Sequence, residues 1–457
     1  MHDPAFFAAL LNTLLCGIRL CTDYSGMGCA EMALANIIAG MGGDFPNVFC
    51  HRASDILPHA RALLLSHTGV AAPRHVFGDL FDRIPTAAFK EMQTAQRKIS
   101  KKVRQAWQTH TEFKARAICR ALGLELCAEC ERIMSQPCHA ISRTRKAWCY
   151  KHNRCCCVSG SSSDSAGIIT ILVAGVTCTD YSSMGSGLHN TGATVLAFYA
   201  FAYQILADLP EIVILECTVL FDTTVLRIFS DEYVIQVIDF SPRELGVPSS
   251  RPRKYMLLTR TSKIRLHLPF DRFHFGKLFF ARRTASSQLY IVVSDEFRQE
   301  GLINSLRKQR GYLKLLDGRP WTLRQVLAPG MFSRLNGYRT LAAEVGEEDG
   351  FVNIGQSPDF MKTIYPVVPT LLQGSVVYSM AREKVFEYPE HLLVMGISSA
   401  FVGVEAVAEF PGTMLPDRVV LGSVSISARQ VRMLCGNGMH LAAVGSCLMF
   451  ALSHERL

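Results

Sequence analysis

Four short apolar segments, each followed by a helix-like stretch, constrain the fold of this 457-residue chain more than any other feature. The segments are rich in Ile, Val and Leu without polar alternation, which is typical of strands buried on both faces. Strand followed by helix, repeated along the chain, predicts an α/β fold with a doubly wound, mostly parallel sheet. The strands are expected near 18–26, 47–54, 168–175 and 211–217.

The remaining apolar stretches do not indicate a secreted or membrane protein. Residues 1–20 carry Asp3 early and lack a basic region and a cleavage site, so we expect an amphipathic helix rather than a signal peptide. No run of about 18 apolar residues occurs, so no membrane partner is expected. We therefore expect an intracellular monomer, nuclear if the source is eukaryotic, whose cysteines are thiols or metal ligands rather than disulfides.

Residues 81–160 account for the whole positive excess of the chain. They contain 16 basic and 6 acidic residues, whereas the whole chain has a net charge of +9, and they hold 8 of the 16 cysteines. Residues 82–166 are therefore predicted to form a basic, cysteine-rich insertion, which ends in the linker at 159–167. The basic run at 97–104 fits either phosphate contacts or a solvated helix face.

The insertion also has a partial zinc-site spacing. Cys127 and Cys130 form a Cys-x-x-Cys pair, but the later residues form no clean second pair. The alternatives are a structural zinc ion and a thiol-rich helical insertion, and no individual metal ligand is assigned. The later candidates are Cys138, His139, Cys149, His152 and Cys155 to Cys157.

Polar residues follow the ends of the predicted strands. The first strand leads into residues 23–28, where Gly26 and Gly28 would let a ligand approach the backbone closely. Asp55 and Asp79 follow the next two strands, where acids of nucleotide-type sites bind ribose hydroxyls or an adenine amino group. Taken singly, each acid equally fits a helix cap.

Two further strand ends carry candidates for chemistry. Cys178 follows the apolar run at 168–175, and a cysteine there is either an activated nucleophile or an inert core residue. Glu216 closes the run at 211–217, and a buried carboxylate is costly without a partner. Arg251 and Arg253 lie in a later basic turn, which could also be simply solvated.

Taken in order, these segments resemble the cytosine-C5 methyltransferase family over nearly the whole chain except the insertion and part of 263–370. Cys178 stands at the nucleophile of the family's Gly-x-Pro-Cys-Gln-x-(Phe/Tyr)-Ser loop, and Glu216 stands in its Glu-Asn-Val motif. The other matching segments are Tyr24 to Gly28, Asp55, Gly78 to Leu80, Gly246 to Arg253, Arg382 to Gly396 and Gly436 to Gly438.

The resemblance implies a class I, Rossmann-like enzyme that uses S-adenosylmethionine to methylate cytosine C5 in DNA. Cys178 would add to C6 of a flipped-out base, Glu216 would hydrogen-bond N3 and the exocyclic amine, and Arg253, with Arg251 nearby, would hold O2. The arginines would also help to lower the pKa of the thiol. The implied cofactor site is lined by Tyr24, Gly26, Gly28, Asp55, Asp79, Leu80 and Asn437.

The resemblance also divides the chain and leaves alternatives open. The catalytic domain is expected in 1–81, 167–262 and 386–457, with a target-recognition region at 263–385. The family's usual residues are replaced by Thr177, Thr179, Cys217 and Ser249, which keeps open a catalytically silent relative that binds nucleic acid. A tRNA-methylating branch shares these motifs, but its Cys-Phe-Thr signature is not evident, so DNA is favoured over RNA.

Overall fold

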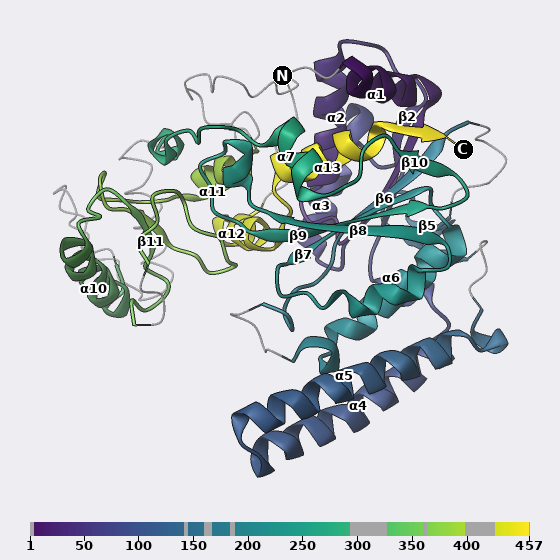
Figure 1. The fold of residues 1–457 in the computed structure, drawn as a ribbon, viewed down its shortest axis with the longest axis horizontal. Coiled ribbons are helices and arrows are strands. Elements are labelled where there is room, and N and C mark those ends of the chain that lie inside the picture. Colours follow the sequence, from purple (N-terminus) through teal and green to yellow (C-terminus); the bar gives the residue numbers. More distant parts are fainter. Residues whose placement is uncertain are drawn as a thin grey trace.

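A computed structural model describes residues 4–140, 145–159, 167–182, 188–292, 327–359, 363–397 and 426–456. Its centre is a nine-stranded sheet with the order β5-β4-β3-β2-β1-β6-β7-β9-β8 (Figure 1). The five central strands, β3-β2-β1-β6-β7, are parallel to one another. At one edge, β9 runs antiparallel to both of its neighbours, β7 and β8. The expected doubly wound, mostly parallel α/β fold is therefore confirmed.

The four predicted strands form, three of them within one residue of the expected bounds, whereas the first ends at Asp23, three residues earlier than expected. They are β1 (Ile18–Asp23), β2 (Val48–Ser54), β6 (Ile169–Gly175) and β7 (Ile212–Thr218). The strand order reverses between β1 and β6, and such a reversal places a crevice at the carboxyl ends of the two strands. The other strands of the sheet are β3 (His75–Phe77), β4 (Lys146–Cys149), β5 (Arg154–Cys157), β8 (Tyr233–Phe240) and β9 (Arg253–Arg260).

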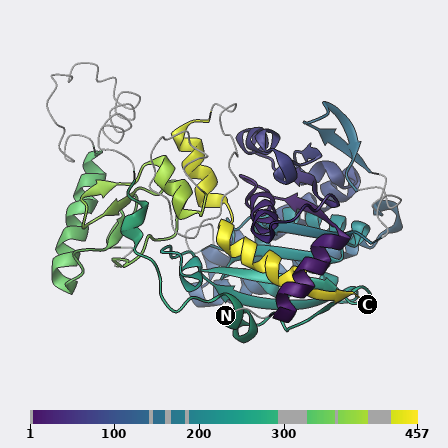
Figure 2. The ribbon, with the colours of Figure 1, turned by 90° about the horizontal axis from the view of Figure 1, so that it is seen from above.

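Helices cover both faces of the sheet (Figures 1 and 2). One core cluster joins the sheet to α1 (Pro4–Cys16), α2 (Cys29–Met41), α3 (Pro58–Ser66) and α13 (Leu441–Leu452). On the other face, a second cluster joins the sheet to α6 (Thr194–Asp208). The segment Arg429–Leu452 is long and apolar enough to cross a membrane, but 67% of its apolar window is buried inside the protein. This segment therefore serves the core, where α13 packs against α2.

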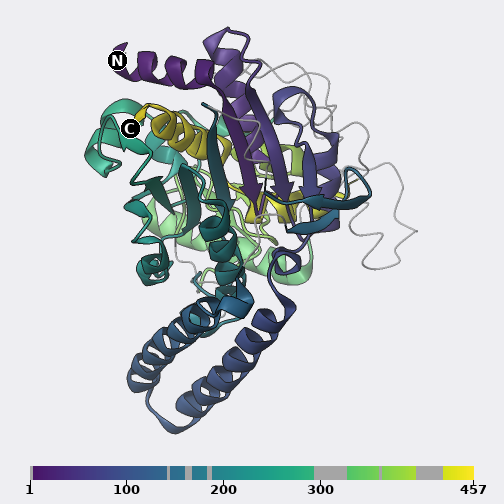
Figure 3. The same cartoon turned by 90° about the vertical axis from the view of Figure 1, so that its right-hand side faces the viewer.

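The predicted insertion has two structurally different parts. Helices α4 (Thr86–Thr109) and α5 (Glu112–Met134) form a long pair that projects from the body of the protein (Figure 3). Strands β4 and β5 then form a hairpin that pairs with β3 and extends the nine-stranded sheet. The insertion thus includes a helical arm, but its second part belongs to the sheet.

A smaller region lies beside the main body, which contains the nine-stranded sheet (Figure 2). It contains α10 (Pro329–Val345), β11 (Phe351–Asn353), β12 (Val377–Ser379) and β13 (Lys384–Val385), and it has its own core around Leu335 and Tyr378. By contrast, β10 (Ile264–Leu266) and α7 (Arg272–Phe279) pack on the main body, where β10 pairs with β14 (His454–Arg456). Helices α11 (Tyr388–Val394) and α12 (Ala428–Asn437) pack against each other and contribute to the core cluster that includes α13.

Candidate active site

Three of the predicted catalytic side chains converge at one edge of the sheet. Cys178 follows β6, Glu216 lies near the end of β7, and Arg253 begins the antiparallel strand β9. The strand register places Gly175 beside Glu216, and Thr218 beside Arg253. Arg253 Nε lies 3.0 Å from Glu216 Oε1, with only 11% and 7% of the two side chains exposed. The charge partner that a buried Glu216 requires is therefore Arg253.

Burial dominates the electrostatics of both Cys178 and Glu216. Burial raises the pKa of the Cys178 thiol, while Arg253 and, more weakly, Arg251 lower it and Glu216 raises it. The arginines therefore act in the predicted direction, but the net shift of this thiol pKa is upward. Burial also raises the pKa of the Glu216 carboxyl, against the opposing effects of Arg253 and Arg251. At neutral pH the thiol is consequently protonated before it reacts.

The loop that carries Cys178 is anchored by the strand next to it. The Cys217 thiol donates to the carbonyl oxygen of Val176 at 3.5 Å, and the Val176 amide donates to the Glu216 carbonyl at 2.9 Å. Farther along the loop, the amides of Tyr181 and Ser182 donate to the Cys178 carbonyl at 2.9 Å. Cys217, which replaces the family's asparagine, thus still ties the loop to β7. The rest of this loop, 183–187, lies outside the described residues.

Arg251 makes a different set of contacts from those of Arg253. Its buried guanidinium donates to the carbonyl oxygens of Leu371, Gly436 and Gly438 at 3.0, 3.0 and 2.7 Å. Burial and the neighbouring Arg253 lower its pKa to about 10. The structure therefore places Arg251 as a positioning residue between β9 and the turn after α12.

The turn after β1 has the geometry of a ligand cradle. Gly26 has a φ of 56°, and a Cβ added there would meet nothing within 4 Å, so open space lies over this glycine. The Gly26 amide donates to Asp55 Oδ2 at 2.8 Å, while the Leu57 amide donates to Asp55 Oδ1 at 2.8 Å. Burial raises the pKa of Asp55. Tyr24 closes the inner side of the turn, since its hydroxyl donates to the Ala197 carbonyl at 2.9 Å.

The other residues predicted to line the cofactor site differ in their burial and in their contacts. A Cβ at Gly28 would lie 2.2 Å from His67 Cε1, so this glycine is needed for packing against His67. Asp79 is half-buried and accepts from the Phe81 amide at 3.0 Å. Leu80 is buried in the second core cluster. Asn437 is exposed at the end of α12 and accepts from Gln373 at 2.9 Å.

A buried ionic cluster lies beneath the carboxyl edge of the sheet, and the sequence motifs did not predict it. Arg83 donates to Asp23 at 2.7 Å, Arg52 lies 3.6 Å from the same carboxylate, and Arg52 also contacts Asp208 at 3.0 Å. The available signal was the presence of the charged residues Asp23 and Arg52 in two predicted buried strands. The cluster fixes the ends of β1 and β2 directly below the turn at Gly26.

The proposed Cys-x-x-Cys pair does not form a metal site among the described residues. Cys127 and Cys130 are buried on α5 within the second core cluster, where Cys127 interacts with Tyr199 of α6. Residues three positions apart on a helix share one face, so this spacing reflects helix packing. Four other side chains, from β3 and the β4–β5 hairpin, lie within ligand distance of one another.

Neither a protein-family model nor a curated protein matches the chain. Among solved structures, the chain is similar to the Dnmt2 methyltransferase of S. pombe (13% identity, 95% of this chain and 98% of that chain, TM-score 0.43). It is also similar to a putative DNA modification methyltransferase encoded within an E. coli prophage (11%, 95% and 98%, TM-score 0.45). A third structure is the Entamoeba histolytica methyltransferase EhMeth (10%, 95% and 98%, TM-score 0.40). Because these identities and TM-scores are low, the function proposed below depends on this chain's own residues.

Proposed function

We propose that this chain is an S-adenosylmethionine-dependent methyltransferase that acts on C5 of cytosine in DNA. The supporting observation is the convergence of Cys178, Glu216 and Arg253 at the carboxyl edge of the sheet. The open turn at Gly26 follows β1, the neighbour of β6 at the strand-order reversal. A nucleophile, a buried acid and a fixed cation beside a cofactor-type turn are the groups that this reaction requires.

Cys178 supplies the nucleophile. C5 of cytosine is part of an aromatic ring and attacks a methyl donor poorly. After the thiol loses its proton, the Cys178 sulfur bonds to C6, and the electron pair of the C5–C6 double bond moves to C5. C5 would then take the methyl group of S-adenosylmethionine, which departs as the neutral thioether S-adenosylhomocysteine. Loss of the C5 proton to a base would restore the double bond and expel the Cys178 thiolate.

Glu216 and Arg253 would stabilise the ring while it carries this charge. Burial raises the pKa of Glu216, which makes its carboxylate a better base, so that it can take up a proton and share it with N3. Its second oxygen can accept from the exocyclic amine. Arg253 is held by Glu216 at 3.0 Å, and its remaining donors can bind O2 of the base. The ion pair therefore preorganises two substrate contacts at once.

The turn after β1 fits the cofactor. The open space over Gly26 admits a ligand close to the backbone, and the half-buried Asp55 and Asp79 follow the adjacent strands at the same edge. Their carboxylates would accept from the ribose hydroxyls and the adenine amino group. When bound, S-adenosylmethionine supplies an electrophilic methyl group.

DNA is the favoured substrate class, and RNA is the alternative. A base within a duplex cannot reach Cys178, so the target cytosine would have to leave the stack. Exposed basic residues on α4 would bind the phosphates of either nucleic acid. We also propose that the protein is an intracellular monomer, nuclear in a eukaryote. The competing hypothesis is a catalytically silent relative that binds nucleic acid, because Thr177 and Cys217 replace the family's usual residues.

Methyl transfer from labelled S-adenosylmethionine tests the proposal. The protein is incubated separately with duplex DNA and with tRNA, beside Cys178→Ala and Glu216→Gln. We expect label in the DNA, no label above background with Cys178→Ala, and a loss of about 100-fold or more with Glu216→Gln. Cys16→Ala is the matched control, because Cys16 is an exposed cysteine on α1.

The outcomes separate the competing functions. Label in tRNA alone would replace DNA by RNA as the substrate. If neither nucleic acid is labelled although the protein still binds S-adenosylmethionine, the protein is a catalytically silent relative. Oligonucleotides that carry 5-fluorocytosine test the adduct, because fluorine at C5 cannot leave as a proton. A covalent complex that persists in denaturant with wild type but not with Cys178→Ala is expected, and its formation by both proteins would exclude Cys178 as the nucleophile.

A further inference from the structure

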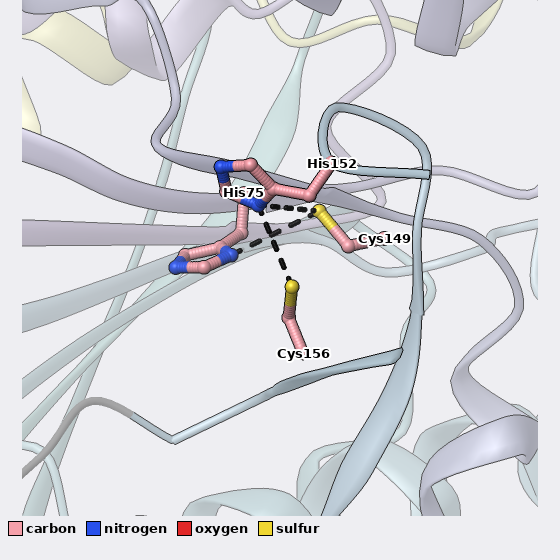
Figure 4. A group of neighbouring side chains, drawn as sticks. All are labelled: His75, Cys149, His152 and Cys156. Atoms are coloured by element: carbon pink, nitrogen blue, oxygen red, sulfur yellow. Dashed lines mark hydrogen bonds between the residues drawn. The ribbon is translucent and has the colours of Figure 1, made fainter. Parts of the chain in front are cut away.

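Two histidines and two cysteines converge at the edge of the sheet formed by β3 and the β4–β5 hairpin (Figure 4). They are His75, Cys149, His152 and Cys156, and their potential ligand atoms all lie within 4.8 Å of one another. His75 starts β3, whereas the other three belong to the hairpin some 70 residues later. The group is separate from the edge that carries Cys178.

The spacing of the four ligand atoms matches a tetrahedral metal centre. Cys149 Sγ lies 3.8 Å from His75 Nδ1 and 3.5 Å from His152 Nδ1, and Cys156 Sγ lies 3.4 Å from His152 Nδ1. With zinc–sulfur and zinc–nitrogen bonds of about 2.3 and 2.0–2.1 Å, a tetrahedral site separates sulfur from nitrogen by about 3.6 Å. The three observed distances lie around this value.

The strand register explains why these residues face the cluster. Cys156 lies opposite Ala147, two residues from Cys149, so both thiols point to the same face of the hairpin. Both are buried, whereas Cys155, on the alternate face, is exposed. In the connecting turn, Asn153 has a φ of 52°, a left-handed conformation that reverses the chain directly after His152.

We propose that His75, Cys149, His152 and Cys156 bind a structural zinc ion. Two thiolates and two neutral imidazoles fill all four positions of a tetrahedral zinc ion, so no position is left for a substrate. The two thiolate charges balance the charge of Zn²⁺. Binding would release one proton from each thiol. The Cys-x-x-His-x-x-x-Cys spacing within the hairpin supplies three ligands from one short segment, and His75 supplies the fourth from the sheet.

The zinc would attach the hairpin to the sheet where backbone pairing is sparse. The only registered pair between β3 and β4 in the described residues is Phe77 with Cys149, supported by the Tyr150 amide, which donates to the Val76 carbonyl at 2.8 Å. Gly78 and Asp79 follow β3 directly, and a Cβ at Gly78 would lie 3.2 Å from the Tyr150 ring. The metal would therefore also support the strand end that presents Asp79.

Metal analysis of the full-length protein tests the site. Protein expressed with zinc and freed of loosely bound metal should contain about one zinc ion per chain. Cys156→Ser and His152→Ala should lose most of it, whereas Cys155→Ser, the adjacent cysteine on the opposite face, should retain it. Chelation should lower the thermal unfolding midpoint of wild type and Cys155→Ser but not that of His152→Ala. His152 is exposed, so this variant should fold even if Cys156→Ser does not.

Cobalt gives a readout that depends on the ligands. Cobalt(II)-loaded wild type should show the intense visible bands of a tetrahedral site and a thiolate-to-metal charge-transfer band, both lost in His152→Ala. Wild type without stoichiometric zinc, or equal zinc in Cys155→Ser, Cys156→Ser and His152→Ala, would overturn the proposal. So would a Cys149–Cys156 disulfide, detected as two missing thiols in denatured protein that was never reduced.

Discussion

The Arg251 guanidinium donates a 2.7 Å hydrogen bond to the carbonyl oxygen of Gly438, 187 residues further along the chain. Its other donors reach the carbonyls of Gly436 and Leu371, at 3.0 Å each. One side chain at the start of β9 therefore holds both the turn that presents Asn437 and the segment that packs against it. A planar guanidinium has several separated N–H donors and can bind three separated carbonyls. The ammonium group of a lysine carries all its donors on one nitrogen and cannot reach all three.

Arg251→Lys is expected to lower the free energy of unfolding by about 2–4 kcal/mol, because buried carbonyls lose their donors. It should also weaken S-adenosylmethionine binding, since the turn at Asn437 loses its support. Urea unfolding and calorimetric titration measure the two effects. Arg282→Lys, at an exposed position, is the control and should change neither. Unfolding curves of Arg251→Lys that overlay those of wild type would contradict this role.

Arg253 should control the reactivity of Cys178 independently of any turnover. Its positive charge lowers the pKa of the thiol, and the Glu216 carboxylate raises it. Arg253→Gln should therefore move the alkylation midpoint of Cys178 to higher pH, and Glu216→Gln should move it to lower pH. Mass spectrometry of the peptide that contains Cys178, after timed iodoacetamide treatment, gives each midpoint. Shifts in the same direction for both variants would contradict the opposed charges.

Glu31 should make stability depend on pH. Burial raises its pKa from 4.5 to about 7, although Thr22 donates a hydrogen bond to its carboxyl. Between these values the folded protein holds a proton that the unfolded chain has released, so Glu31 lowers stability progressively as the pH rises. Glu31→Gln removes this loss and keeps an acceptor for Thr22. We expect it to stabilise the protein by an amount that grows between pH 5 and pH 8 to on the order of 3 kcal/mol.

Chemical denaturation at several pH values measures this difference. Glu347→Gln, at an exposed carboxyl, is the control and should give a difference that does not vary with pH. A Glu31→Gln effect that is equally constant would show that the Glu31 carboxyl titrates normally in the folded protein.

The outer face of α4 should contribute to nucleic-acid affinity. Arg97, Lys101 and Arg104 recur at i, i+4 and i+7 and are exposed, while Ile99 and Val103 between them are buried. Reversing each charge to Glu should weaken binding of every sequence alike and reduce the salt slope by about one per lost phosphate contact. Fluorescence anisotropy across a salt series measures both quantities. Lys263→Glu, another exposed basic residue, controls for net charge, and an equal loss there would assign the effect to charge alone.

The local parts of this fold could be predicted from sequence, and the long-range parts could not. The runs that became β1, β2, β6 and β7 are apolar and short, and parallel strands bring their carboxyl ends to one edge, which is why Cys178 and Glu216 could be placed together. The ion pair between Glu216 and Arg253 follows from one antiparallel register.

The metal-ligand cluster shows what sequence spacing does not contain. Three residues of the group, Cys149, His152 and Cys156, are among the metal candidates that the sequence offers, but the fourth, His75, is not, and Cys127 and Cys130 pack in the core instead. Only the pairing of β4 with β3 brings these segments together, and such pairing has no local sequence signal. Likewise, nothing near Arg251 indicates that its partners are carbonyls near the end of the chain.

The packing of α13 against α2 has a consequence for the order of biosynthesis. At typical translation rates, the roughly 400 residues between these helices take about 20–80 s to synthesise. During that interval the part of α2 that packs against α13 lacks its cover, although α2 can already pack against β1 and the turn at Gly69. We therefore expect this apolar helix face to be available to chaperones on the nascent chain, and the Arg251 contacts to form only once residues 436–438 have been synthesised.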